Sequence, residues 1–430
     1  MMKNVIRAVV LSLPLTCFAA DFTPTEQQMV DYVRAHQTQQ LSFLEKIVNI
    51  NSGTQNIKGV TQVGETLKPE FEKLGFKVRW AYPPASMHRA GTLIAERVGK
   101  KGKRLLLIAH LDTVFAADNP FQTLKRIGSH MTGPGALDDK GGDVIILGAL
   151  QAMNSQKALD DATITVVMTG DEEDSGKPSD ISRKPLIDVA KNADVALDFE
   201  GSDTVDTLST ARRGVEVWEI KTTGKQAHAA QIFQKSVGFG ANFEMARILN
   251  SVREQMSTEQ YFAFNPGLMA GGDVVTDDET HSSATVTGKQ NIIAKSALVK
   301  GDFRYISPEQ RDQAKTKIET IVKQSLPLTS AQVTFKGGIP AMPPTKNNEA
   351  LLEQYNQISQ TLGAGPVTAL DPNLRGAGDI SYVAGLVNAN LVGLGPVGVG
   401  GHTQDEIIDI KAFGTQTERA AVFMYRLVNQ

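Results

Sequence analysis

The sequence is short of cysteine, and this absence excludes two kinds of chemistry. Cys17 is the only cysteine among 430 residues. It lies in an N-terminal segment with the layout of a cleaved secretory signal, so the mature chain is expected to hold no thiol. Neither a cysteine nucleophile nor a disulfide framework is then available. No G-x-S-x-G segment occurs either, and this argues against a serine hydrolase with a nucleophile elbow.

A strong charge of either sign is also missing. The chain has 44 Lys and Arg against 47 Asp and Glu, a formal net charge of −3, and no long run of one sign. Nucleic acid is therefore not an expected partner. The hydrophobic fraction of 41% and the charged fraction of 21% are typical of a globular protein, and the length suits two or three domains.

The apolar run near the N-terminus is too short to span a bilayer. Lys3 and Arg7 form a positive region, an apolar stretch follows over 8–15, and small residues stand at 19–20. This layout predicts a cleaved signal peptide over 1–20, a periplasmic or secreted protein and no stable membrane anchoring. A buried first helix is the alternative.

Four apolar runs end abruptly in polar residues that can bind metal. They are 105–109 before His110, 164–168 before 171–173, 195–197 before 198–200, and 391–394 before the glycine-rich stretch that leads to His402. Unbroken runs of this length predict strands of a parallel sheet that is covered by helices, such as those expected over 25–48, 60–74 and 143–153. Because ligands bind beyond the carboxyl ends of such strands, we expect the four polar clusters along one sheet edge.

A second pattern interrupts the first from about residue 214 to 337. A strand over 215–220 is followed by a helix over 238–253, a strand over 297–305, a helix over 308–324 and a strand over 331–335. The predicted fold class is therefore α/β, a mostly parallel sheet flanked by helices, with an inserted α+β (ferredoxin-like) domain. The expected boundaries are 21–213 and 338–430 for the two parts of the first domain and 214–337 for the insertion.

The polar clusters together contain one complete set of ligands for two zinc ions. Zinc takes histidine nitrogen and carboxylate oxygen, and a catalytic site keeps one position for water. Two ions about 3.5–4 Å apart need a bridging carboxylate and further ligands on each side. Glu172 and Glu173 are adjacent and cannot point the same way, so one can bind metal while the other remains a base. Each polar cluster alone would be interpreted as an ordinary solvated turn. Because every cluster follows a predicted buried strand and together they make up a full ligand set, a metal site is favoured.

Five short motifs then follow one another along the chain. They are H-x-D-T-V at 110–114, G-x-G-x-x-D-x-K-G-G at 133–142, Asp-Glu-Glu at 171–173, Phe-Glu at 199–200 and G-K-x-x-H at 224–228. Together they resemble the dizinc exopeptidase family that includes the glutamate carboxypeptidases, acetylornithine deacetylase and aminoacylase. The resemblance extends from about residue 44 over nearly the whole remaining chain, and the bacterial glutamate carboxypeptidases are the most similar branch.

The resemblance implies one role for each metal ligand. Asp138 would bridge two zinc ions, with His110 and Glu200 on one ion and Glu173 and His402 on the other. The same ligands can also bind cobalt or manganese. The choice among these metals depends on their relative affinities for the site and on their availability.

It also implies the catalytic groups around those ligands. Glu172 would be the general base, Asp112 would orient His110, and a cis peptide bond is expected at Asp138-Asp139. His228, from the inserted lid domain, would stabilise the developing oxyanion. In relatives this histidine often comes from a partner subunit, which implies a homodimer formed through the lid domain.

Substrate recognition rests on fewer residues. The resemblance implies that Arg304 and Asn291 hold the substrate carboxylate, and that Gly378 belongs to a loop lining the pocket. Selectivity for a glutamate side chain needs a further cation, for which Arg212 and Arg213 are candidates by position only. The extra residues over 271–278 depart from the family pattern and affect the expected pocket shape.

The implied activity is that of a dizinc metallocarboxypeptidase acting on small peptides or N-acyl amino acids and releasing glutamate. An N-acyl-amino-acid deacylase of the same family is the alternative, and an inactive binding protein with the same fold is a more distant one. A G-x-G-x-x-G stretch at 393–398 lies too near the C-terminus for a dinucleotide-binding unit.

Overall fold

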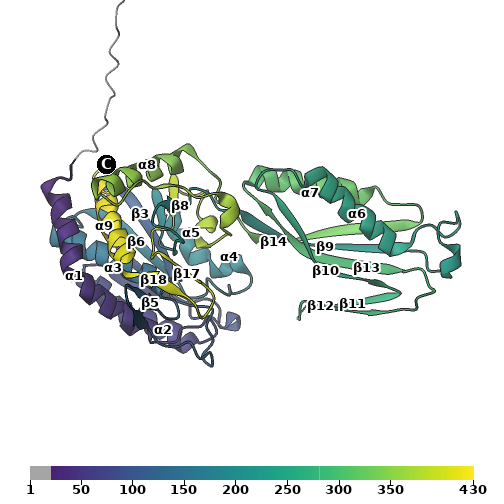
Figure 1. Cartoon of the computed structure of the whole chain (residues 1–430), viewed down its shortest axis with the longest axis horizontal. Helices are drawn as coiled ribbons and strands as arrows, with labels where there is room; N and C mark the ends of the chain where they lie inside the picture. The colour runs from purple at the N-terminus through teal and green to yellow at the C-terminus, as the bar shows by residue number, and fades with distance from the viewer. Residues whose placement is uncertain (1–20, 280) are drawn as a thin grey trace, which may run out of the picture.

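The computed structural model describes residues 21–279 and 281–430, so the predicted signal peptide lies outside the described residues. The chain forms two lobes (Figure 1). The larger lobe contains the segments before residue 214 and after residue 339, and the narrower second lobe contains the segment between them. Within the described ranges, no helix is both long enough and apolar enough to cross a membrane.

The larger lobe is built on a mixed sheet of six strands in the order β1-β2-β6-β3-β7-β16. Their bounds are β1 Lys77–Ala81, β2 Thr92–Arg97, β3 Lys101–His110, β6 Ala162–Thr169, β7 Val195–Asp198 and β16 Ala389–Val392. β6, β3, β7 and β16 pair in parallel, whereas β1 and β2 pair antiparallel. The prediction that the four apolar runs are neighbouring parallel strands is confirmed.

Helices cover both faces of this sheet, and this is why its strands are apolar without alternation. On one face, α1 (Pro24–Val48), α3 (Lys140–Ser155) and α9 (Ile410–Leu427) share a core with the strands. α2 (Ile57–Lys73) packs near β1, and α8 (Lys346–Thr361) packs against β16. The other face carries a smaller core with α5 (Lys184–Ala190), while the short α4 (Ser179–Ser182) precedes α5.

Short strands support the loops around the sheet edge. β4 (Lys125–Ile127), β5 (His130–Thr132), β17 (Gly398–Val399) and β18 (Ile407–Asp409) form a small sheet, and β8 (Thr207–Leu208) pairs with β15 (Thr368–Ala369). β17 and β18 pair antiparallel, so the segment between them, which contains His402, is a loop held at both ends.

The second lobe has the βαββαβ order of a ferredoxin-like fold. Its elements are β9 (Gly214–Gly224), α6 (Gly240–Met256), β10 (Ala263–Gly272), β13 (Ser296–Tyr305), α7 (Pro308–Lys323) and β14 (Thr329–Ile339). The strands are antiparallel in the order β10-β13-β9-β14, and they share a hydrophobic core of their own with both helices. The predicted fold class is confirmed, while the residue boundaries of the domains stay predictions.

The five-element pattern predicted for this lobe is incomplete. It lacks β10, and it lacks the hairpin of β11 (Val274–Asp278) and β12 (Ser283–Thr287). β10 was missed because Pro266 and Gly267 interrupt its pattern, at a point where the pairing with β13 shifts register. Proline is tolerated there because β10 is an edge strand with a bulge.

Candidate metal centre

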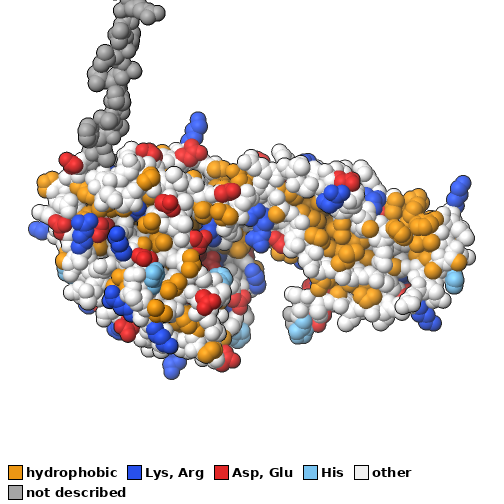
Figure 2. Space-filling model, viewed as in Figure 1, with side chains coloured by type: hydrophobic (Ala, Val, Ile, Leu, Met, Phe, Trp, Pro, Cys, Tyr) orange, Lys and Arg blue, Asp and Glu red, His pale blue; other side chains and the backbone are white. Residues whose placement is uncertain are grey.

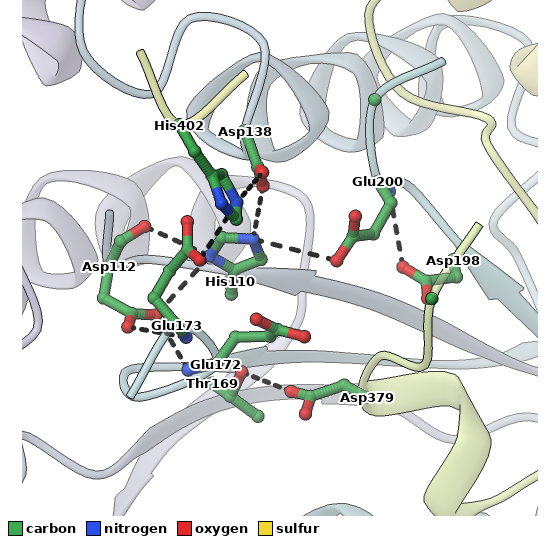
Figure 3. Close-up of polar contacts among 12 residues, drawn as sticks. His110, Asp112, Asp138, Thr169, Glu172, Glu173, Asp198, Glu200, Asp379 and His402 are labelled. Atoms are coloured by element: carbon green, nitrogen blue, oxygen red, sulfur yellow. Dashed lines mark hydrogen bonds and ion pairs between the residues drawn. The ribbon is translucent and has the colours of Figure 1, made fainter. Parts of the chain in front are cut away.

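The candidate site lies at the carboxyl edge of the large sheet (Figure 3). His110 is the last residue of β3, and residues 171–173 follow the end of β6. Glu200 follows β7, Asp138 precedes α3, and His402 comes from the loop between β17 and β18. Parallel pairing of β6, β3 and β7 therefore brings residues distant in sequence to one place, as expected for this class of sheet.

The Asp138 carboxylate lies between two imidazoles. Its Oδ1 is 2.9 Å from His110 Nε2, and its Oδ2 is 3.0 Å from His402 Nε2. The peptide bond between Asp138 and Asp139 is cis, as predicted. Two oxygens of one carboxylate facing two separate histidines form the arrangement that a bridging ligand requires.

One further carboxylate lies beside each histidine. Glu200 Oε1 is 3.9 Å from His110 Nε2, and Glu173 Oε2 is 3.2 Å from His402 Nε2. The other oxygen of Glu173 is buried and has no hydrogen-bond partner, so a ligand position is open there. Histidine and carboxylate are the donors that zinc accepts, and the residues present therefore fit a centre of two divalent ions.

At this edge of the sheet, two groupings of ligand atoms among the described residues are compact enough to hold an ion. In the sets His110–Asp138–Glu173 and His110–Glu172–Glu200, the ligand atoms lie within 4.8 Å of one another. The second set contains Glu172 where the sequence prediction has Asp138. We favour Asp138 as the ligand because it alone faces both histidines, while the Glu172 and Glu173 carboxylates point in different directions (Figure 3).

Asp112 connects the histidine to the acidic loop. His110 Nδ1 lies 3.1 Å from the Asp112 carbonyl oxygen and 3.4 Å from its Oδ1. The same carboxylate accepts hydrogen bonds from the Thr54 hydroxyl, at 2.6 Å, and from the backbone amides of Glu172 and Glu173. Asp112 is fully buried, so it fixes the His110 ring and the start of the acidic loop together.

Burial and the crowding of carboxylates govern protonation here. Burial raises the pKa of Glu172 well above its usual value, and Glu200 and Asp379 raise it further. Burial also raises the pKa of Glu173, to about 9, with Asp138 adding to the effect. Burial opposes the charged form of Asp138 as well, but its hydrogen bonds with His110 and His402 hold its pKa below the usual range.

The sequence analysis missed several groups that hold the ligands. The buried Glu406 accepts backbone hydrogen bonds from Gly135, Leu137 and Asp138, and so fixes the loop that carries the Asp138 carboxylate. Its place four residues after His402 was the available signal, but a glutamate near a histidine is too common to interpret alone.

A buried ion-pair network supports the other side of the site. Arg183 donates to Asp379 at 2.5 Å and to Asp171 at 2.7 Å, and Thr169 donates to the second oxygen of Asp379. These contacts tie the loop around Gly378 to the loop that carries Glu172. The sequence offered no signal for them, because the partners are far apart along the chain.

A cavity of about 500 Å³ opens beside the candidate ligands. Its lining includes Asp138, Glu200, His402, Arg212, Arg375, Gly376 and Ala377. Gly378 is not part of this lining. It lies against Arg212 instead, where a side chain would meet the guanidinium, since a Cβ at this position would be 2.7 Å from Arg212 Nη1.

The predicted residues of the second lobe do not all reach this cavity. His228 and Asn291 belong to neighbouring segments, joined by a bridge between His228 and Ile292 and a hydrogen bond from Ala229 to the Asn291 carbonyl. Both lie next to the outer ends of strands, because β9 runs outward from Gly214 to Gly224 and pairs antiparallel with β13. His228 follows the end of β9, and Asn291 precedes the start of β13. At about 3.3 Å per residue, β9 separates His228 from the junction of the lobes by roughly 30 Å.

Arg304 lies at the opposite, inner end of the second lobe. Arg304 pairs with Val215 near the start of β9. Its Nη1 is 4.0 Å from the position that a Cβ on Gly376 would occupy. The structure therefore brings Arg304 to the cavity loop of the larger lobe, and it does not bring His228 or Asn291 there.

Comparisons with known proteins agree with this geometry. The model of peptidase family M20/M25/M40 matches residues 106–428. Carboxypeptidase G2 from Pseudomonas sp. (strain RS-16) is 28% identical over 435 residues, covering 98% of both chains.

Two solved structures show the same fold at low identity. Aminopeptidase PepT from Bacillus cereus has a TM-score of 0.72 at 18% identity, covering 91% of this chain and 98% of its own. The YXEP protein from Bacillus subtilis, described as a dinuclear metal binding peptidase, has a TM-score of 0.65 at 14% identity, covering 92% of this chain and 100% of its own.

The protonation pattern predicts that metal binding releases protons. In the metal-free chain, burial opposes the charge of His110, yet Asp112 and Asp138 raise its pKa well above the usual value. Glu173, with a pKa of about 9, is also protonated at pH 7. Because both must lose a proton to bind metal, affinity for zinc should rise with pH through the neutral range.

Calorimetric titration of the metal-free protein with zinc, in buffers of different ionisation enthalpy, measures the protons released. We expect one or more protons per chain near pH 7 and fewer near pH 9. Zinc uptake with no buffer dependence and no change in affinity with pH would contradict this assignment.

Proposed function

The chain belongs to peptidase family M20/M25/M40 and is a hydrolase of the peptidase class, and from this premise we propose that it is a two-metal carboxypeptidase. It hydrolyses the amide bond next to a free carboxylate, and its substrates are small peptides or N-acyl-glutamates from which it releases glutamate. The observation that carries the proposal is the Asp138 carboxylate, which faces His110 on one side and His402 on the other. The similarity to a carboxypeptidase over 98% of the chain supports the choice of reaction.

We assign the metal ligands as the resemblance implies. Asp138 bridges, His110 and Glu200 bind one ion, and Glu173 and His402 bind the other. Zinc is the proposed metal, with cobalt and manganese as possible substitutes. When bound, such ions polarise the scissile carbonyl and lower the pKa of water at the site to about 7.

Glu172 is the proposed general base. Its carboxylate points away from that of Glu173 and toward the space near Glu200 (Figure 3). With Asp138 in place of Glu172 as the ligand shared with His110 and Glu200, the Glu172 carboxylate is left for proton transfer. It takes a proton from the attacking water as oxygen adds to the carbonyl carbon. It then delivers this proton to the leaving nitrogen as the carbon–nitrogen bond breaks. The Asp112 carboxylate accepts a hydrogen bond from the backbone amide of Glu172 and so keeps the base in position.

Arg304 is the proposed ligand of the free carboxylate of the substrate. Its Nε already donates to Asp302 at 2.7 Å, which leaves the outer face of the guanidinium toward the loop at Gly376. A guanidinium binds a carboxylate through two parallel hydrogen bonds, which lysine does not reproduce. The Gly378 loop is proposed to complete the carboxylate-binding region. Asn291 lies beside His228 at the outer end of the second lobe, so its proposed role requires that it, too, act from a partner subunit.

His228 is proposed to act from a partner subunit. It is exposed at the far end of β9, whereas an oxyanion donor must lie within hydrogen-bond distance of the reacting carbonyl. Two chains joined through their second lobes in an isologous dimer would each supply this histidine to the other.

We also propose a periplasmic or extracellular location, because residues 1–20 have the layout of a cleaved signal.

The first test of the reaction uses Glu172→Gln. Removal of the base should lower kcat by about 100- to 10,000-fold on an N-acyl-glutamate. The metal content, measured by mass spectrometry, should stay near two ions per chain, because Glu172 is not a proposed ligand. Loss of one ion in this variant would mean that Glu172 is a ligand, and full activity would refute its role as base. If the protein releases amino acids from N-acyl amino acids but not from peptides, the alternative function of N-acyl-amino-acid deacylase is favoured.

The second test asks whether His228 acts in trans. Glu172→Gln and His228→Ala chains are each expected to be nearly inactive alone. After unfolding and refolding together, about a quarter of wild-type activity should return, because half of the dimers then contain one complete site. A mixture no more active than its parts, or a monomer in sedimentation, would contradict supply by a partner.

A further inference from the structure

Four arginines converge on one loop at the mouth of the metal cavity. The loop spans residues 372–378, and the side chains are Arg212, Arg213, Arg304 and Arg375. Arg213 donates to the Asn373 carbonyl, and Arg212 donates to the carbonyls of Gly376 and Ala377. Burial and the charge of Arg304 lower the pKa of Arg213, and Asp371 offsets this only in part. Like charges are therefore crowded here.

Arg375 is the member of this group that both lines the cavity and remains partly accessible. Its side chain is 19% exposed, and its Nη2 donates to the Gly201 carbonyl at 2.8 Å. The same nitrogen is 3.7 Å from Glu200 Oε2. This anchoring holds the guanidinium beside a proposed metal ligand, with its remaining face toward the cavity.

Arg212 lines the same cavity, and its guanidinium is only partly satisfied. Its side chain is 6% exposed, its Nε donates to the Gly376 carbonyl at 2.5 Å, and its Nη1 is buried with no hydrogen-bond partner. The nearest carboxylate oxygen, Glu200 Oε2, is 3.9 Å from that nitrogen. A buried guanidinium without a matched anion is costly, so this residue indicates an anion that is supplied from outside the chain.

The carboxylates around the cavity do not supply that anion. Asp138 and Glu200 line it, but both are proposed metal ligands whose charge the divalent ions would exceed. Asp203 also lines the cavity, and it is exposed to solvent. With the metals bound, the arginine side of the cavity is therefore positive.

A second cavity beside the site has a different character. It measures about 540 Å³ and is lined by Gly53, Thr54, Gln55, Asn56, Val114 and Ala116, together with Glu173 and Asp174. It contains no arginine or lysine. The two cavities flank the candidate ligands, so the site offers a substrate one end with two arginines and one end without any basic side chain.

We propose that Arg375, backed by the buried charge of Arg212, binds a second carboxylate of the substrate, the side-chain carboxylate of the residue that is released. This inference rests on the proposed carboxypeptidase function, in which Arg304 takes the α-carboxylate. The substrate class is then a peptide or N-acyl compound that ends in an acidic residue, with its acyl part in the cavity that has no basic side chain. Arg375 is a specificity-determining residue that the sequence analysis did not single out.

The test compares substrates that differ only in the side-chain charge. Wild type should cleave a C-terminal glutamate faster than the isosteric glutamine, and Arg375→Gln should reduce that ratio of kcat/KM by about 10- to 100-fold. Most of the change should fall on KM for the glutamate substrate. Arg375→Lys keeps the charge and should retain part of the preference. Arg104→Gln, which removes an exposed arginine from the amino-terminal half of β3, is the matched control and should change nothing.

Binding of the free products provides a readout that does not depend on turnover. Calorimetry of the mature chain, with and without zinc, should show glutamate binding more tightly than glutamine, and Arg375→Gln should remove the difference. Equal binding of both amino acids to wild type, or an unchanged preference in Arg375→Gln, would overturn the proposal. If no substrate is cleaved, the proposed function fails, and the calorimetric comparison still decides whether Arg375 reads the side-chain carboxylate.

Discussion

The contact of one carboxylate with two imidazoles is the constraint on which the rest of the site depends. Asp138 reaches His110 and His402 only because the three chain segments that carry these residues are each fixed in position. The parallel sheet fixes His110 at the end of β3, the small sheet of β17 and β18 fixes the His402 loop, and Glu406 fixes the Asp138 loop through three backbone amides. The helices packed on both sheet faces hold the strand ends, and with them this geometry, in place.

The same edge of the sheet concentrates buried carboxyl groups. Burial raises the pKa of Asp139 and Asp143 well above their usual values, and it raises that of Asp198 to about 8. The oxygens of Asp139 and Asp143 are buried without hydrogen-bond partners. Buried carboxylates are tolerated when they are protonated, paired or bound to metal. Divalent ions at the proposed centre would offset the charge of those carboxylates that are ionised, and Arg212 and Arg375 line the cavity on one side of it.

The large sheet and the metal-ligand candidates could be predicted from sequence because each leaves a local signal. An apolar run that ends in His110 or in residues 171–173 reports both a buried strand and its carboxyl end. The edge strand β10 could not be predicted in this way, because Pro266 and Gly267 break its pattern at a bulge.

The supporting residues of the site left no comparable signal. Glu406, Arg183 and Arg375 act on partners that are far away in sequence, and only the fold brings each pair together. A strand or helix depends largely on residues that are neighbours along the chain, so it leaves a local sequence pattern. An ion pair between two loops forms only when the chain is folded, so it leaves no such pattern. His228 lies at the outer end of the second lobe, and its proposed role depends on a second copy of the chain.

The measurement that tests the central claim most directly is anomalous diffraction from crystals of the mature chain grown with zinc. Two peaks about 3.5–4 Å apart are predicted on either side of the Asp138 carboxylate, one beside His110 and Glu200 and the other beside Glu173 and His402. A single peak, or two peaks that do not share Asp138, would contradict the account of this carboxylate as the bridge on which the site is built.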